Sequence, residues 1–104
     1  MQNSPQRGLG GVDLGDRERR IALEILLYLA EHPDAKDSLA GIRLWWLEEP
    51  DKWTVGELQR AADALVRRGI LQSWESGPDA RVFGPSKHFL EKPEEFIREY
   101  RPLT

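Results

Sequence analysis

One segment of this sequence, residues 54–69, carries nearly every signal of a complete helix. Thr54 and Glu57 have the spacing of a capping box, in which each side chain accepts a hydrogen bond from the other residue's backbone N–H. Gly69 stands where a left-handed residue commonly ends a helix. The segment therefore predicts a bounded amphipathic helix, with an inner face formed by Val55, Leu58, Ala62, Leu65 and Val66.

After Gly69 the apolar pattern changes from helical to alternating spacing. Residues 70–75 and 80–84 fit short strands, and the segment from Ser76 to Asp79 between them consists of residues that favour turns. Pro85 closes the second strand. The pattern predicts an antiparallel β-hairpin directly after the helix.

Three further helices are predicted. The first runs over residues 17–31 with Asp16 as its cap and ends before Pro33, because a residue that precedes proline is pushed out of the helical region. The second is short, begins after Asp37 or Ser38, and carries Leu39, Ile42 and Trp46 on one face. The third begins at Pro93 and stops before Pro102. Residues 1–15, rich in glycine, are expected to be a disordered tail.

Length and composition narrow the class of protein. A chain of 104 residues has room for one domain, and the absence of cysteine excludes disulfides, thiolate nucleophiles and zinc fingers. No apolar run approaches the roughly 20 residues that span a bilayer, and the start of the chain lacks the apolar stretch of a signal peptide. We expect a cytoplasmic protein with no membrane partner.

The stretch WTVGELQRAADALVRRGILQ, residues 53–72, resembles the third helix and first wing strand of winged helix-turn-helix proteins, particularly small bacterial transcription regulators. A polar cap, a leucine in the first turn, Ala-x-x-Leu in the middle and Gly before two apolar residues carry the resemblance, which extends from Arg17 to Gly84. It implies an α+β fold, mostly helical, with a two-stranded hairpin as the wing. Residues 16–88 would form this domain, and residues 89–104 an appended C-terminal helix and tail.

The resemblance also implies a contact surface for double-stranded DNA. The helix over residues 54–68 would be the recognition helix, and the tip over residues 76–79 the wing. Gln59 and Arg60 are suited to hydrogen-bond base edges. The cations suited to phosphate contact are Arg67, Arg68, Arg81 and Lys87.

An alternative is a winged-helix module for protein–protein interaction or oligomerisation that does not bind DNA. The net charge is −3, and Glu57 and Asp63 lie on the helix that would meet the phosphates. Trp45 and Trp46 point about 100° apart on a helix, so we expect one of them near the surface. The expected interface of a homodimer consists of Trp45, Trp74, Phe96, Ile97 and Tyr100.

Catalysis and metal binding find little support in the sequence. His32 and His88 are the only histidines, and neither has metal-ligand spacing to other residues. Ser86, Lys87 and His88 are sequence neighbours without a third group that would complete a triad. We therefore expect no enzyme, no cofactor and no metal. A small-molecule sensor would need a pocket lined by the tryptophans.

Overall fold

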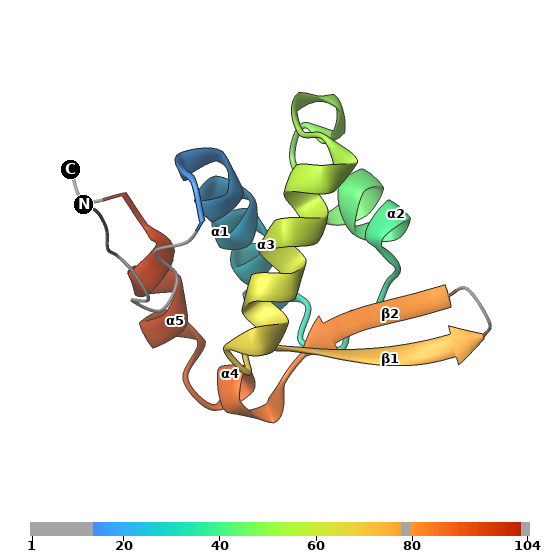
Figure 1. Cartoon of the computed structure of the whole chain (residues 1–104). Coiled ribbons are helices and arrows are strands. Elements are labelled where there is room, and N and C mark those ends of the chain that lie inside the picture. The colour runs from blue at the N-terminus through green and yellow to red at the C-terminus, as the bar shows by residue number, and fades with distance from the viewer. Residues whose placement is uncertain (1–13, 78–79, 103–104) are drawn as a thin grey trace, which may run out of the picture.

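The computed structural model describes residues 14–77 and 80–102, and these form an α+β fold with a two-stranded antiparallel hairpin (Figure 1). The α+β class and the hairpin predicted from the sequence are confirmed. The residues 1–13 of the expected tail lie outside the described part, whereas Leu14 is already buried. In chain order the elements are α1 (Asp16–Glu31), α2 (Leu39–Gly41), the π-helix η2 (Ile42–Trp46), the 3-10 helix η3 (Pro50–Lys52), α3 (Val55–Arg67), β1 (Leu71–Gly77), β2 (Ala80–Pro85), α4 (Lys87–Glu91) and α5 (Pro93–Tyr100).

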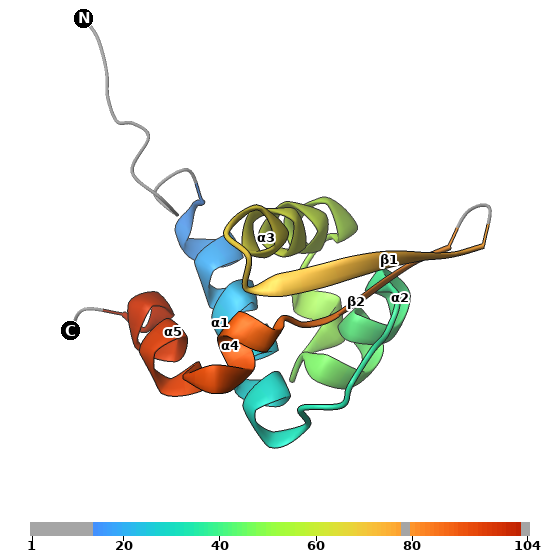
Figure 2. The ribbon, with the colours of Figure 1, turned by 90° about the horizontal axis from the view of Figure 1, so that it is seen from below.

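Helix α1 is the centre of the molecule. It packs against α3, α5 and η2, and in Figure 2 it lies between α5 and α3. Asp16 was predicted as the cap of α1, but it is the first helical residue and Gly15 occupies the cap position. The Glu18 carboxylate accepts a hydrogen bond from the Gly15 N–H at 2.8 Å. Within residues 14–77 and 80–102, no helix combines the length and hydrophobicity that a transmembrane span requires. The buried residues of α1 are Ile21, Ala22, Leu23, Ile25, Leu26 and Leu29.

Helix α3 begins and ends as its sequence predicts. The Thr54 hydroxyl accepts a hydrogen bond from the Glu57 N–H at 3.0 Å, and the Glu57 carboxylate accepts one from the Thr54 N–H at 3.0 Å. Gly69 has a φ of 75°, the left-handed conformation that ends the helix. One predicted inner residue is misplaced: Val55 lies in the first turn of α3 and is exposed.

Replacing Gly69 with alanine is expected to lower the free energy of unfolding by about 1–2 kcal/mol, because an L-residue with a Cβ is strained in the left-handed region. Nothing lies within 4 Å of the added Cβ, so the loss comes from the backbone alone. Gly56→Ala is the matched control, since its Cβ meets Arg60 at an ordinary 3.6 Å and its φ is helical. Urea denaturation of both variants checks this, and equal stability of Gly69→Ala and the wild type would contradict it.

The second helix departs from a regular α-helix. Ser38 caps α2 by accepting a hydrogen bond from the Gly41 N–H at 3.2 Å. A side chain at Gly41 would collide with the Asp37 carboxylate, which explains a glycine within a helix. The chain then widens into the π-helix η2, which is rare in proteins and frequent at functional sites. Within η2, Trp46 is buried and Trp45 is exposed, as the divergence of two adjacent helical residues predicts.

The hairpin is anchored at one end and projects from the body at the other (Figures 1 and 2). Its register pairs Leu71 with Pro85 and Trp74 with Val82, and a bulge follows Glu75. The Phe83 backbone exchanges two hydrogen bonds with Asp37, at 2.8 and 3.0 Å, so the segment before α2 joins the sheet as an isolated bridge. The predicted tip includes residues 78–79, which lie outside the described part.

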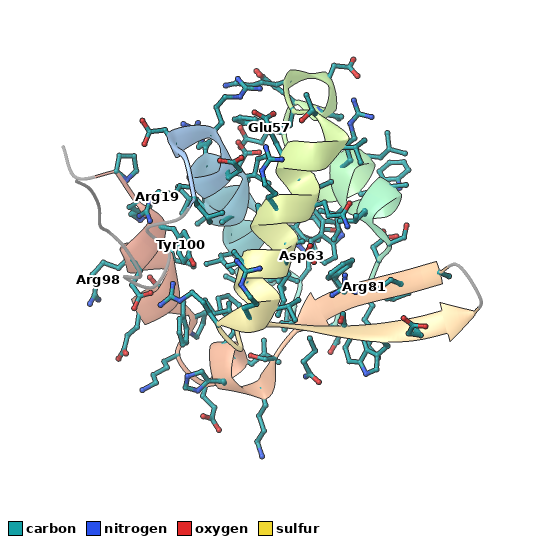
Figure 3. All side chains as sticks on the ribbon, viewed as in Figure 1. Arg19, Glu57, Asp63, Arg81, Arg98 and Tyr100 are labelled. Atoms are coloured by element: carbon teal, nitrogen blue, oxygen red, sulfur yellow. The ribbon has the colours of Figure 1, made fainter. Side chains whose placement is uncertain are left out.

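The C-terminal segment folds back onto the domain. Helix α4 was not predicted, and α5 packs against α1. Figure 3 shows Arg19 next to Tyr100, and the Arg19 guanidinium donates to the Glu99 carbonyl at 2.7 Å. Ile97 and Tyr100 are only 3% and 2% exposed. These two residues were predicted to belong to a self-association interface, whereas the structure places them in the core of the same chain. Phe96 is partly buried against that core.

Candidate functional site

The outer face of α3 carries three of the side chains predicted to contact DNA. Gln59, Arg60 and Arg67 are exposed on this helix, and Arg68 follows it at the C-cap. Arg81 comes from β2, and Lys87 is the first residue of α4. The fold thus places Gln59, Arg60 and Arg67 on one helix and brings Arg81 beside it.

Arginine ion pairs link α3 and its C-cap to α1, β2 and α5. Arg60 reaches the Glu18 carboxylate of α1 at 2.8 Å. Figure 3 shows Arg81 facing Asp63, with a nitrogen–oxygen distance of 3.1 Å. Arg68 donates to the Tyr100 hydroxyl at 2.7 Å and pairs with the Glu99 carboxylate at 2.8 Å. Arg60, Arg68 and Arg81, all predicted to contact DNA, therefore lie in ion pairs within the chain.

Glu57 is the most strongly perturbed acid of this face. The Arg17 guanidinium hydrogen-bonds to its carboxylate, with one nitrogen–oxygen distance of 3.0 Å, and the Thr54 backbone N–H donates to it as well. These donors favour the charged form and lower the pKa of Glu57 from 4.5 to about 2. The hydrogen bond from Arg60 likewise lowers the pKa of Glu18. Both carboxylates stay ionised at neutral pH beside the outer face of α3.

The depressed pKa of Glu57 predicts acid sensitivity. A carboxylate whose pKa is lower in the folded than in the unfolded chain contributes stability above the unfolded pKa and loses it below. Stability should therefore fall as the pH drops from about 4.5 toward about 2. Glu57→Gln keeps an oxygen for the capping hydrogen bond but cannot ionise, so this variant should show a weaker loss over the same range. Thermal unfolding of both proteins across this range measures the difference, and parallel curves would contradict the assignment.

Exposed apolar side chains lie on η2 and in the first turn of α3. Leu44 is 58%, Trp45 70% and Val55 53% exposed. Leu44 and Val55 line one small groove of about 230 Å³ between α2–η2 and α3. We call Leu44, Trp45 and Val55 the η2 face. Trp45 was predicted as an interface residue, whereas Leu44 and Val55 were not. Leu44 is an apolar residue outside the face formed by Leu39, Ile42 and Trp46. That position in the sequence could have indicated that its side chain is exposed.

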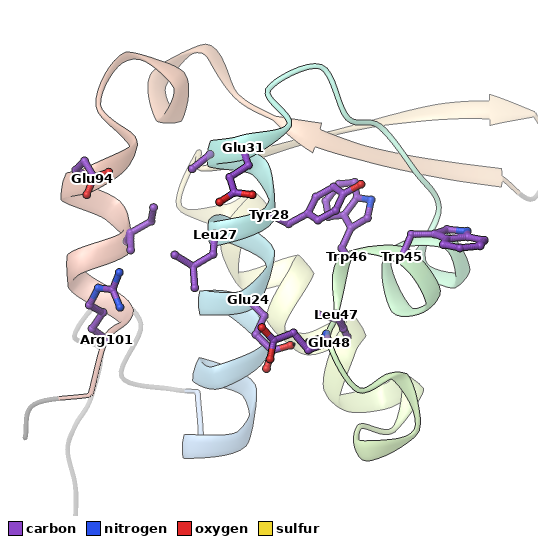
Figure 4. A pocket seen from close by; sticks show the side chains of 12 residues that line it. Glu24, Leu27, Tyr28, Glu31, Trp45, Trp46, Leu47, Glu48, Glu94 and Arg101 are labelled. Atoms are coloured by element: carbon purple, nitrogen blue, oxygen red, sulfur yellow. Dashed lines mark hydrogen bonds between the residues drawn. The ribbon is translucent and has the colours of Figure 1, made fainter.

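A second concavity lies across α1, between α5 and η2 (Figure 4). It has a volume of about 670 Å³, and α1 contributes Glu24, Leu27, Tyr28 and Glu31 to it. Tyr28 stacks on the Trp46 ring at 5.2 Å and on the His32 ring at 4.1 Å. Two residues predicted to form an interface, Trp45 and Ile97, line this concavity, and Trp46 lines it as well. The tryptophan-lined pocket that a small-molecule sensor would need stays a prediction.

Trp74 occupies a different part of the molecule from Trp45. It lies on β1, is partly exposed, and has the Lys36 ammonium 5.1 Å from its ring. Trp45 lines the concavity across α1 together with Ile97 of α5, whereas Trp74 does not line it. A homodimer interface that combines both tryptophans with α5 stays a prediction.

His32, His88 and Ser86 make contacts that stabilise the fold. The Ser86 hydroxyl accepts a hydrogen bond from the Phe89 N–H at 3.0 Å and caps α4. His88 packs edge-on against Phe96, with ring centroids 5.1 Å apart. Among the described residues, no group of three or more His, Cys, Asp or Glu side chains is placed to hold a metal ion.

Comparison of the chain with protein-family models, with curated proteins and with solved structures finds no match.

Proposed function

We propose that this chain is a winged-helix interaction module that self-associates through the η2 face. The winged-helix assignment is supported by the order of the elements: α1, the α2–η2 helix and α3 precede a hairpin. The backbone bridge between Asp37 and Phe83 adds a third paired segment to that hairpin. The resemblance of residues 53–72 to winged-helix sequences agrees with this order.

The observation that carries the interaction role is the exposure of Leu44, Trp45 and Val55. Single exposed apolar residues are common on soluble proteins, but exposed apolar side chains at an apolar groove are typical of an interaction site. Leu44 and Val55 line such a groove, and Trp45, the neighbour of Leu44 in η2, lines the concavity across α1. Tryptophan in particular dominates binding energy at protein interfaces, since one ring buries a large apolar area. A π-helix presents two of these three side chains.

A second copy of the chain fits the charges around the η2 face. Arg43 lines the groove and lies 3.9 Å from the Asp51 carboxylate, and Lys52 lies 4.0 Å from Glu49 in the segment that follows η2 in the chain. In a two-fold dimer the same patch meets itself, so each charge must find its opposite on the copy. A patch of one sign would repel itself, whereas this rim carries both signs.

The charges beside α3 favour this role over DNA binding. Exposed ion pairs contribute only about 0–1 kcal/mol each, so the pairs of Arg60 and Arg81 are weak enough to open and would not by themselves prevent contact with phosphates. When these pairs open, the carboxylates of Glu18 and Asp63 stay on the surface that DNA would contact. Their negative charge would repel the phosphates of the DNA.

Sedimentation velocity over a range of concentrations tests self-association directly. The wild type should shift from monomer to dimer as concentration rises, and Trp45→Ser should weaken the dimer by about thirtyfold, the effect of losing about 2 kcal/mol at an interface hot spot. Trp74→Ser is the matched control, since it removes another partly exposed tryptophan and should leave the dimer unchanged. A monomeric wild type, or equal weakening by the two substitutions, would overturn the proposal.

DNA binding is the second candidate, because Gln59 and Arg60 lie on an exposed helix face flanked by the hairpin. Fluorescence anisotropy with duplex DNA at about 50 and about 200 mM salt separates the two roles, since phosphate contacts give a steep salt dependence. A DNA-binding protein would lose specific affinity by about 1–3 kcal/mol in Arg60→Ala, whereas Arg67→Ala would weaken binding to all sequences. Absence of binding at the lower salt would exclude this candidate.

A further inference from the structure

The concavity across α1 combines a partly apolar floor with an acidic rim; we call it the acidic groove. Its floor contains Leu27, which is 37% exposed, and the Tyr28 ring. Figure 4 shows α1 between a wall from α5, with Glu94 and Arg101, and a wall from the segment around Trp46 and Glu48. The carboxylates that line it are Glu24, Glu31, Glu48 and Glu94.

Most of the rim charge is not neutralised within the chain. Glu24 lies 3.4 Å from Arg20 and accepts a hydrogen bond from the Glu48 N–H at 3.2 Å. The carboxylates of Glu31, Glu48 and Glu94 form no ion pair or hydrogen bond with the residues that the structure describes. Arg101 is the one cation among the described residues lining the groove. The lining thus carries four carboxylates against one guanidinium.

The spacing on α1 gives the acidic groove a direction. Glu24, Leu27 and Glu31 follow one another at three- and four-residue steps, so they form a stripe along one side of the helix. The stripe extends over about 10 Å, which is the length of about two helical turns of a partner. The α1 stripe, an apolar residue between two carboxylates, is complementary to a partner helix that carries an apolar residue between two cations.

We propose that the acidic groove binds a cationic amphipathic helix of a partner protein. Apolar side chains of that helix would pack on Leu27 and Tyr28, and its lysines or arginines would pair with Glu31, Glu48 and Glu94. This is the helix-in-groove mode of peptide recognition, with charge complementarity that selects the partner. Nucleic acids and anionic lipid surfaces are excluded as occupants, because both would be repelled by the rim.

The acidic groove shares one residue, Trp45, with the η2 face. Trp45 reaches the far edge of the acidic groove, but the other two residues of the η2 face, Leu44 and Val55, line the other groove. Val55→Ser therefore weakens the proposed dimer without touching the acidic groove. Titration of the peptide into this variant therefore tests peptide binding when self-association is weakened, so one proposal can be wrong while the other holds.

A synthetic lysine–leucine amphipathic helical peptide, labelled with a fluorophore, is the probe. Titrations use the full chain as wild type, as Val55→Ser and as the double variant Glu31→Gln/Glu94→Gln. The matched control is Glu75→Gln/Glu91→Gln, which removes the same charge at exposed positions outside the groove. A second peptide, with serine in place of leucine, tests the contribution of the apolar floor.

The rim variant should bind the lysine–leucine peptide about tenfold more weakly at constant salt, since two ion pairs of this kind contribute about 1–2 kcal/mol together. The control variant should lose less than about threefold. The serine peptide should bind more weakly than the leucine peptide, and Val55→Ser should bind the leucine peptide at least as tightly as the wild type does. Equal losses in the rim and control variants would mean that bulk charge alone attracts the peptide and would overturn the proposal. Absence of binding by the wild type, or equal binding of the two peptides, would overturn it as well.

Discussion

Replacing Tyr100 with alanine is expected to lower the free energy of unfolding by about 3–5 kcal/mol, the usual cost of removing a buried aromatic ring. The ring is buried, and the guanidinium groups of Arg19 and Arg68 lie 5.2 and 5.6 Å from its centroid. Its loss would leave a cavity at the junction of α1, α3 and α5. Since domains of this size are stable by about 5–15 kcal/mol, urea denaturation should show a large fall in the midpoint.

Tyr100→Phe is the control for this prediction. It keeps the ring and removes only the hydroxyl that accepts a hydrogen bond from Arg68 at 2.7 Å, so it should cost about 0.5–1.5 kcal/mol. The pair also separates the two roles considered for Tyr100. If Tyr100→Ala kept its stability but changed the oligomeric state, the residue would belong to an interface and our placement of α5 in the core would be wrong.

Phe83→Ala is expected to cost a similar amount, about 3–5 kcal/mol. Phe83 is fully buried, its ring has the Arg81 guanidinium 4.7 Å away, and its backbone exchanges two hydrogen bonds with Asp37. The side chain therefore anchors the hairpin to the helical body. The alanine variant should unfold at markedly lower urea concentration than the wild type.

Trp74→Ala offers the comparison on the neighbouring strand. Trp74 pairs with Val82 in the hairpin but is partly exposed, so its truncation should cost less than half as much as that of Phe83. Comparable losses in the two variants would mean that the hairpin is held through Trp74 as much as through the buried face. In that case the exposed part of the tryptophan would not be available to a partner.

The sequence predicts well what is fixed by local chemistry. The capping box at Thr54, the stop at Gly69 and the hairpin that follows depend on residues close to one another in the chain, and all three are confirmed. The α4 helix could not be predicted, because five residues are too few for a periodic pattern. The widening of the second helix into a π-helix has no local sequence signal that we can identify.

The candidate sites depend on contacts that sequence spacing does not contain. Glu18 and Arg60 are 42 residues apart, so their ion pair follows only from the packing of α1 against α3. The amphipathic pattern of Ile97 and Tyr100 correctly indicates an apolar face on the last helix. It does not say whether the same chain or a second one covers that face, and the structure assigns it to α1 of the same chain.

The indole N–H signals of the protein's four tryptophans, recorded by NMR during dilution, test the central proposal most directly. Self-association through the η2 face predicts that the signal of Trp45 moves with concentration, while those of buried Trp53 and of Trp74 on the hairpin stay in place. Val55→Ser should suppress the movement. Four signals that do not change over the whole range of concentrations, or a shift of Trp74 without one of Trp45, would contradict the account.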